Sequence, residues 1–90
     1  MFHYKVAYRM EMGAFFAQVL DFPEVTAFGP ALADARRNLC QALRYAAELR
    51  LRRGGILPVP DPDTPAPDAY CVEFVGVMPT DDTLVHVQAL

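Results

Sequence analysis

The chain has 90 residues, a formal net charge of −3 and 53% hydrophobic residues, which fits one domain over residues 1–90 with a small core. No apolar run approaches the ~20 residues of a transmembrane helix, and charges interrupt the first ten residues, MFHYKVAYRM, unlike a signal peptide. We therefore expect a cytoplasmic protein. The chain contains no serine, which excludes a serine nucleophile.

The first thirty residues predict three strands. Residues 2–11 alternate between apolar and mostly polar side chains, and this period of two is typical of a strand with one face in the core. Gly13 is expected to take a positive φ in a turn. Residues 14–20 then return as a second strand, and residues 25–28 (VTAF) form a third.

The stretch DFPEVTAFG joins the second and third predicted strands. Its carboxylates, Asp21 and Glu24, could serve acid–base or metal-dependent hydrolysis, but that chemistry needs several converging acids. Asp also favours turns, because its side chain can accept from backbone N–H groups. We therefore interpret Asp21 and Pro23 as a structural corner and keep Asp21 alone as a candidate for chemistry. Gly29 and Pro30 are expected to lead the chain into a helix.

Residues 30–53 carry apolar side chains at the i, i+3, i+4 and i+7 spacing of a helix with one buried face. Gly54-Gly55 is predicted to end it. The six arginines of the helix give residues 31–53 a formal charge of +4, whereas residues 54–90 carry six acids, no Lys or Arg and a charge of −6. We expect the basic and acidic regions to attract each other, within one chain or between chains.

The C-terminal part begins with five prolines in residues 56–68, which predict an extended segment, the connector, that returns the chain to the sheet. Residues 70–78 are predicted as a strand, and residues 83–89, after a turn at 79–82, can add another. The predicted fold class is α+β: a β-β-β-α-β antiparallel sheet with one long helix on one face and an optional extra C-terminal strand.

Sequence support for other chemistry is weak. His3 and His86 have no neighbouring ligand cluster, so no metal is expected. Cys40 and Cys71 lack CxxC spacing and are expected to be free thiols. We find no phosphate-binding glycine motif and expect no cofactor. The helix arginines could contact phosphates, but an acidic chain with one long helix argues against direct nucleic-acid binding.

The order of these motifs resembles the HicB-like antitoxins. The resemblance covers roughly residues 3–60, through the corner at 21–24, Gly29, the helix core 34–38 (DARRN) and the exit 54–60 (GGILPVP). It implies a partial RNase H-like domain without enzymatic activity, which binds and blocks a small, basic, mRNA-cleaving toxin. Three features depart from the family: Ala31 replaces a capping Thr, Glu24 stands where Gly is common, and the C-terminal DNA-binding domain of many members is missing.

Small domains often gain stability by self-association, so we expect a homodimer or a higher oligomer, with residues 70–78 and 83–89 pairing across a two-fold axis. The candidate residues for a dimer or partner interface are Arg44, Asp61, Asp63, Tyr70, Val72, Phe74, Val85 and Val87. Two alternatives stay open. One is a solitary homo-oligomeric domain without a toxin partner, and the other is an RNase H-like nuclease that uses Asp21.

Overall fold

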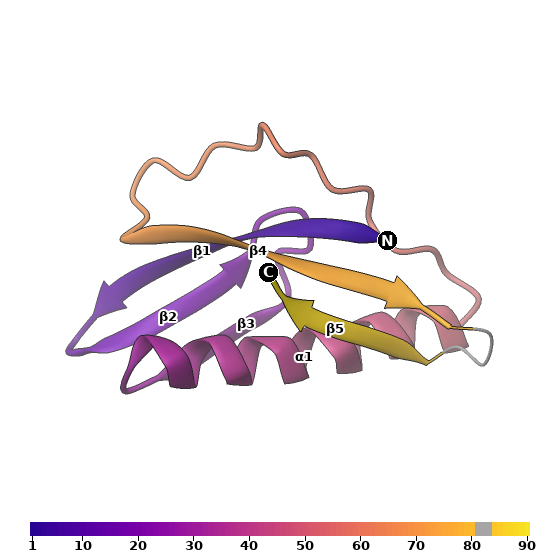
Figure 1. The fold of residues 1–90 in the computed structure, drawn as a ribbon, viewed down its shortest axis with the longest axis horizontal. Coiled ribbons are helices and arrows are strands. Elements are labelled where there is room, and N and C mark those ends of the chain that lie inside the picture. The colour runs from indigo at the N-terminus through magenta and orange to yellow at the C-terminus, as the bar shows by residue number, and fades with distance from the viewer. Residues whose placement is uncertain (81–83) are drawn as a thin grey trace.

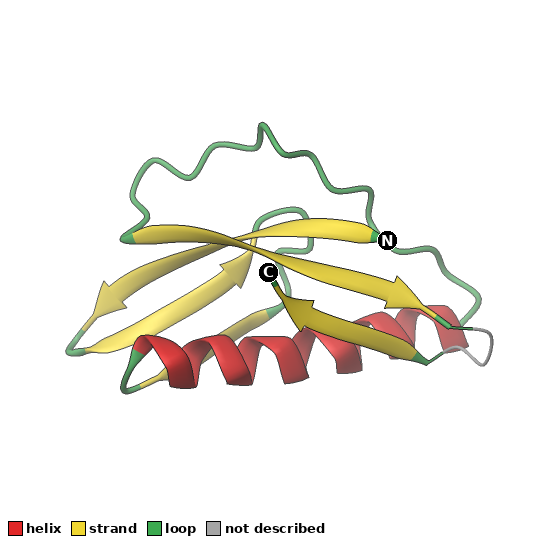
Figure 2. Cartoon of the chain, viewed as in Figure 1, coloured by secondary structure: helices red, strands yellow, loops and turns green. Residues whose placement is uncertain are grey.

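The computed structural model describes residues 1–80 and 84–90, and in it one helix packs against one face of a five-stranded antiparallel sheet (Figures 1 and 2). The elements are β1 (Phe2–Glu11), β2 (Ala14–Val19), β3 (Thr26–Gly29), α1 (Leu32–Arg52), β4 (Cys71–Pro79) and β5 (Val85–Ala89). The strand order is β3-β2-β1-β4-β5. The predicted α+β fold class is confirmed, including the extra C-terminal strand. Asp81, Asp82 and Thr83, which were predicted in the last turn and strand, lie outside the described residues.

The β1–β2 hairpin follows from its alternating pattern and its turn. Val6 pairs with Val19 and Tyr8 with Ala17, so the apolar sets of the two strands share one face. Met12 and Gly13 have φ values of 51° and 81°. Two positive φ values in a two-residue loop define a type I′ turn, whose twist matches that of the strands. The predicted conformation of Gly13 is confirmed, whereas that of Met12 was not predicted.

The corner between β2 and β3 is one residue wider at each end than predicted. The N–H of Phe22 donates to the carbonyl of Val19, and the N–H of Val25 donates to the carbonyl of Phe22. Two consecutive turns closed by these bonds form the corner, so β2 ends at Val19 and β3 begins at Thr26.

The helix is shorter than the predicted 30–53. Ala31 is the N-cap, in an extended conformation, and Pro30 therefore precedes the helix and does not enter its first turn as predicted. At the other end Gly54 has a φ of 76°. The N–H of Gly54 donates to the carbonyl of Leu51, and the N–H of Gly55 donates to that of Arg50. This pair of bonds is a Schellman motif, so the predicted glycine stop is confirmed. Within the described residues no helix is long and apolar enough to cross a membrane.

The core lies between α1 and the sheet. It is formed by the aromatic and aliphatic side chains of β1, β2, β4 and the corner, together with one stripe of α1; its fully buried members include Tyr4, Val6, Tyr8, Val19, Phe22, Leu39, Leu43, Val75 and Val77. Burial of each large apolar side chain contributes about 1.5–3 kcal/mol. The helix approaches β3 closely, because a Cβ on Gly29 would lie 2.4 Å from the backbone nitrogen of Ala35.

Helix side chains bond to both edge strands of the sheet. The Nδ2 of Asn38 donates to the carbonyl of Phe28 in β3 (2.8 Å), and the N–H of Val85 in β5 donates to Oε2 of Glu48 (3.0 Å). Occupied edge groups make pairing with another chain less favourable. β4 is an inner strand between β1 and β5. Of the two segments expected to pair across a two-fold axis, residues 70–78 thus lie inside the sheet and β5 forms an edge. The pairing itself stays a prediction.

Candidate binding face

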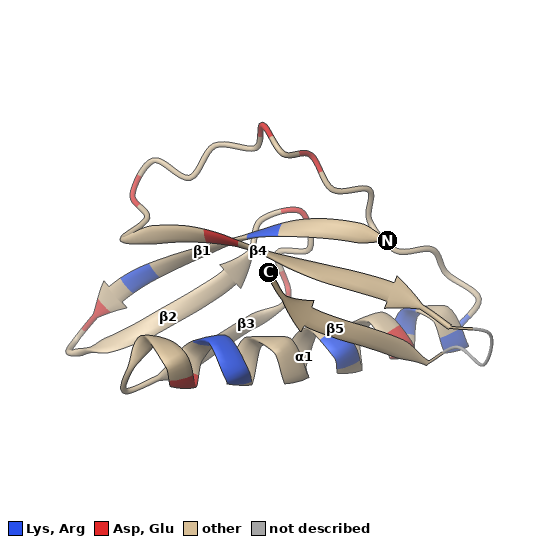
Figure 3. Cartoon of the chain, viewed as in Figure 1, with Lys and Arg blue, Asp and Glu red and all other residues tan. Residues whose placement is uncertain are grey.

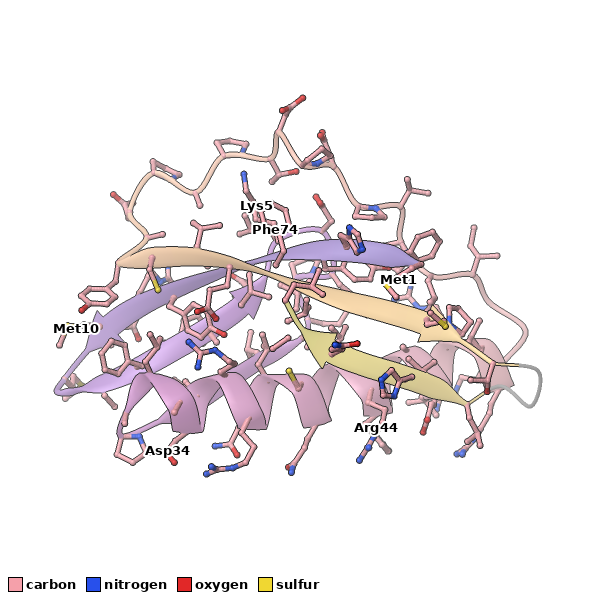
Figure 4. All side chains as sticks on the ribbon, in the orientation of Figure 1. Met1, Lys5, Met10, Asp34, Arg44 and Phe74 are labelled. Atoms are coloured by element: carbon pink, nitrogen blue, oxygen red, sulfur yellow. The ribbon has the colours of Figure 1, made fainter. Side chains whose placement is uncertain are left out.

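The face of the sheet opposite α1, which we call the open face, is crossed by the connector (Figure 1). By alternation it carries His3, Lys5 and Ala7 of β1 and Val72 and Phe74 of β4. Figure 4 shows Lys5 and Phe74 on the connector side of the sheet, whereas Asp34 and Arg44 project from α1 on the other side.

Three side chains hold the connector over the open face. Oδ2 of Asp21 accepts from the N–H of Asp61 (2.7 Å), and Oδ1 accepts from Oγ1 of Thr64 (2.8 Å). The Nζ of Lys5 donates to the carbonyls of Pro62 and Thr64 at 2.9 and 3.0 Å. The hydroxyl of Tyr4 donates to the carbonyl of Pro58, and burial raises the pKa of Tyr4 to about 12, so it stays a donor at neutral pH. Asp21 thus has a structural role with both oxygens occupied.

The connector and the open face enclose a hollow of about 780 Å³. Its apolar walls come from Val72 and Phe74, from Leu90, and from Pro60 and Pro62 of the connector, with His3 beside them. Val72 and Phe74 are 40% and 37% exposed. A concave, mostly apolar surface with a few polar groups is the usual form of a binding site.

Acidic residues of the connector are next in sequence to the prolines that line this hollow. Asp61 and Asp63 are exposed on the connector and have no ion-pair partner among the residues that the structure describes. Together with Asp21 they outnumber Lys5 and Arg9, which lie beneath the connector. Figure 3 shows that the connector carries acidic residues while most Lys and Arg residues lie on α1. The two sides of the molecule therefore differ in the sign of their charge.

A second polar cluster, the ion pair of Arg36 with Glu73, links α1 to β4. Arg36 donates twice to the carboxylate of Glu73, from Nε at 2.8 Å and from Nη2 at 2.6 Å. The hydrogen bonds from Arg36 lower the pKa of Glu73. Burial raises the pKa of Cys40 and of Cys71 beside this pair, which disfavours the reactive thiolate. Both cysteines are free, as expected. We therefore interpret the ion pair and the two thiols as structural groups and not as reactive ones.

The residues of the corner between β2 and β3 also make contacts that stabilise the fold. Oε2 of Glu24 accepts from Nη2 of Arg50 at 2.7 Å, and the guanidinium of Arg50 lies 4.7 Å from the ring centroid of Phe22. The carbonyl of Pro23 accepts from the side chain of Gln18. Arg50 thereby joins the corner to the end of α1. In residues 1–80 and 84–90, no group of three His, Cys, Asp or Glu side chains could hold a metal ion.

The predicted interface residues separate into four groups. Val72 and Phe74 line the hollow, with Asp61 and Asp63 exposed on the connector that forms one of its walls, and Arg44 lies on the outer side of α1. Tyr70 stacks on Phe15 with ring centroids 5.4 Å apart. Val85 is only 5% exposed and Val87 is partly buried against the core, so both contribute to the core of this chain. Their role in an interface stays a prediction.

Sequence reasoning missed the hollow itself and its walls from Pro60, Pro62, Leu90 and His3. The alternation of β1 put His3 beside Lys5, but the pairing of β1 with β4 was needed to bring Val72 and Phe74 next to them. Comparison with protein-family models, curated proteins and solved structures gave no match. The resemblance to HicB-like antitoxins stays a prediction.

Proposed function

We propose that this protein is a non-enzymatic protein-binding module that binds a small basic partner on its open face. The observation that supports this proposal is the apolar hollow, together with the exposed Asp61 and Asp63 on the connector that forms one of its walls, on the side of the molecule away from the arginines of α1. Apolar surface supplies affinity, and complementary charge supplies orientation and rapid association. A basic mRNA-cleaving toxin of the kind that HicB-like antitoxins block has the required charge, and the module would act by covering its RNA-binding surface.

Three carboxylates already accept hydrogen bonds that stabilise the fold, and this favours a binding function over catalysis. Asp21, Glu24 and Glu73 are each bonded to groups that hold the fold together. A hydrolytic site needs carboxylates that are free to bind a metal or to exchange a proton. Metal-dependent RNA cleavage by the purified protein that Asp21→Asn abolishes, with the fold intact, would contradict a non-enzymatic module.

Co-expression tests the partner. The gene is expected to lie beside a short reading frame for a basic protein, and the tagged chain is expected to co-purify with that product and to suppress its RNA cleavage. Reversing the charges with Asp61→Lys and Asp63→Lys should weaken the complex by at least about tenfold. Arg53→Glu, on the helix side, is the matched control and should leave it unchanged. A gene without such a neighbour and a chain that binds no basic protein would refute the proposal.

A further inference from the structure

The outer side of α1 carries an exposed aromatic side chain among arginines. Tyr45 is 68% exposed, and at 100° per residue Arg37, Arg44 and Arg52 lie on the same side of the helix. The acids on this side are engaged: Asp34 pairs with Arg37, and Glu48 accepts from the N–H of Val85. This surface thus carries three arginines against two acids, a formal charge of +1, with the exposed ring of Tyr45 among them.

The open face has the opposite character. Its hollow is apolar, and Asp61 and Asp63 on the connector are exposed beside it. Tyr and Arg are the residues that most often dominate binding energy at protein interfaces, where they fill pockets from which water is excluded. The exposed ring of Tyr45 and the guanidinium of Arg44 therefore match this hollow and its aspartates in both polarity and charge.

We propose that the open face of one copy of this chain binds the outer side of α1 of a second copy, with Tyr45 in the hollow and Arg44 beside Asp61 and Asp63. Charge complementarity selects a copy in this orientation, since two open faces in contact would bring their aspartates together. The inference does not depend on the proposed basic partner, because both surfaces belong to this chain.

The two surfaces lie on opposite sides of the molecule (Figure 4), so one copy can use both at once. Such a contact is heterologous: it generates a closed ring if the rotation per copy closes, and otherwise an open chain. The mass should therefore increase beyond that of a dimer as the protein concentration rises. A symmetric dimer would stop at two copies.

Two variants, each blocked on one side, test the contact. Arg44→Glu with Tyr45→Ser blocks the helix side, and Val72→Glu blocks the hollow. Each is expected to weaken self-association by at least about tenfold. An equimolar mixture of the two should form a dimer that does not grow, because each variant keeps one intact surface for the other. The masses are measured by light scattering and sedimentation across the micromolar range.

Controls separate this contact from unfolding and from general surface effects. Tyr45 and Val72 are exposed, so both variants should keep the circular dichroism and thermal unfolding of the wild type. Phe28→Glu alters an aromatic residue that is 57% exposed on β3, which β2 separates from the strands that line the hollow, and it should leave the mass unchanged. A wild type that stays monomeric overturns the inference and leaves the proposed function intact. Blocked variants that associate normally, or a mixture that forms no dimer, also overturn it.

Discussion

At the scale of single residues, Met12 occupies a backbone conformation that suits its side chain poorly. Its φ of 51° lies in the left-handed region, which costs an L-residue with a Cβ about 1–2 kcal/mol, and Asn-Gly is a preferred pair for this turn. We expect Met12→Asn to raise the free energy of unfolding by about 1 kcal/mol in urea titrations. Met10→Asn, an exposed position within β1, is the control. An equal or larger gain at Met10 would contradict this explanation.

Gly29 is required for a different reason, since its φ is not positive. An added Cβ would lie 2.4 Å from the nitrogen of Ala35 and 2.7 Å from the Cβ of Asp34, so α1 would have to move away from β3. Gly29→Ala should lower the free energy of unfolding by about 2 kcal/mol. At Gly54 an added Cβ would have no described atom within 4 Å, so Gly54→Ala would be disfavoured only by the positive φ. That conformation costs a residue with a Cβ about 1 kcal/mol. A smaller loss at Gly29 than at Gly54 would refute the close approach.

The pair of Glu73 with Arg36 should make stability depend on pH. The pKa of Glu73 is lowered from its ordinary value near 4.5, so the pair stabilises the fold above that pH and the contribution is lost as pH falls through the lowered pKa. We expect Glu73→Gln to cost about 1 kcal/mol at pH 7, a modest loss because 34% of the Arg36 side chain is exposed. In acid the wild type and the variant should converge. Parallel curves of unfolding free energy against pH would contradict this role.

At the scale of elements, the sequence predicted the strands and the helix whose residues follow a local apolar pattern. The alternation of residues 2–11 and the apolar stripe of the helix gave β1 and α1 nearly to their ends. The remaining boundary errors come from turn hydrogen bonds that residue propensities do not predict, such as the bond from the N–H of Phe22 to the carbonyl of Val19, where β2 ends. The path of the connector over the open face, and hence the hollow, depends on β4 lying beside β1. That pairing joins residues about seventy positions apart, and no local pattern encodes it.

The connector has little regular structure, so its position depends on a few side-chain bonds. Asp21→Ala removes two of them, to the N–H of Asp61 and the hydroxyl of Thr64. Each bond to a charged group is worth about 1.5–3 kcal/mol, so the amide of Asp61 should exchange at least about tenfold faster with solvent deuterium. Thr64→Val, which removes only one bond, should have a smaller effect. Unchanged exchange at Asp61, or equally faster exchange at Leu39 in the core, would contradict a local anchor.

At the scale of the whole molecule, the uneven charge of the sequence becomes two oppositely charged sides. The arginines of residues 31–53 lie along α1, and the acids of the connector lie across the sheet from them (Figure 3). The predicted attraction between basic and acidic regions is partly satisfied within the chain by Arg36 with Glu73, whereas Arg50 pairs with Glu24, which lies outside the acidic region. Arg44, Asp61 and Asp63 have no ion-pair partner in residues 1–80 and 84–90, and we therefore propose them for contacts between molecules.

This polarity predicts the sign of a salt effect on self-association. Raising the salt concentration from ~0.1 to ~1 M shortens the Debye length from about 10 to about 3 Å. Contacts between α1 of one copy and the open face of the next join opposite charges, so the dissociation constant should rise severalfold, while the apolar contact of Tyr45 preserves part of the affinity. Two open faces in contact would instead associate more tightly in salt, because screening would relieve the repulsion between their aspartates. Sedimentation at both salt concentrations distinguishes the two arrangements, and tighter association in salt would contradict the head-to-tail contact.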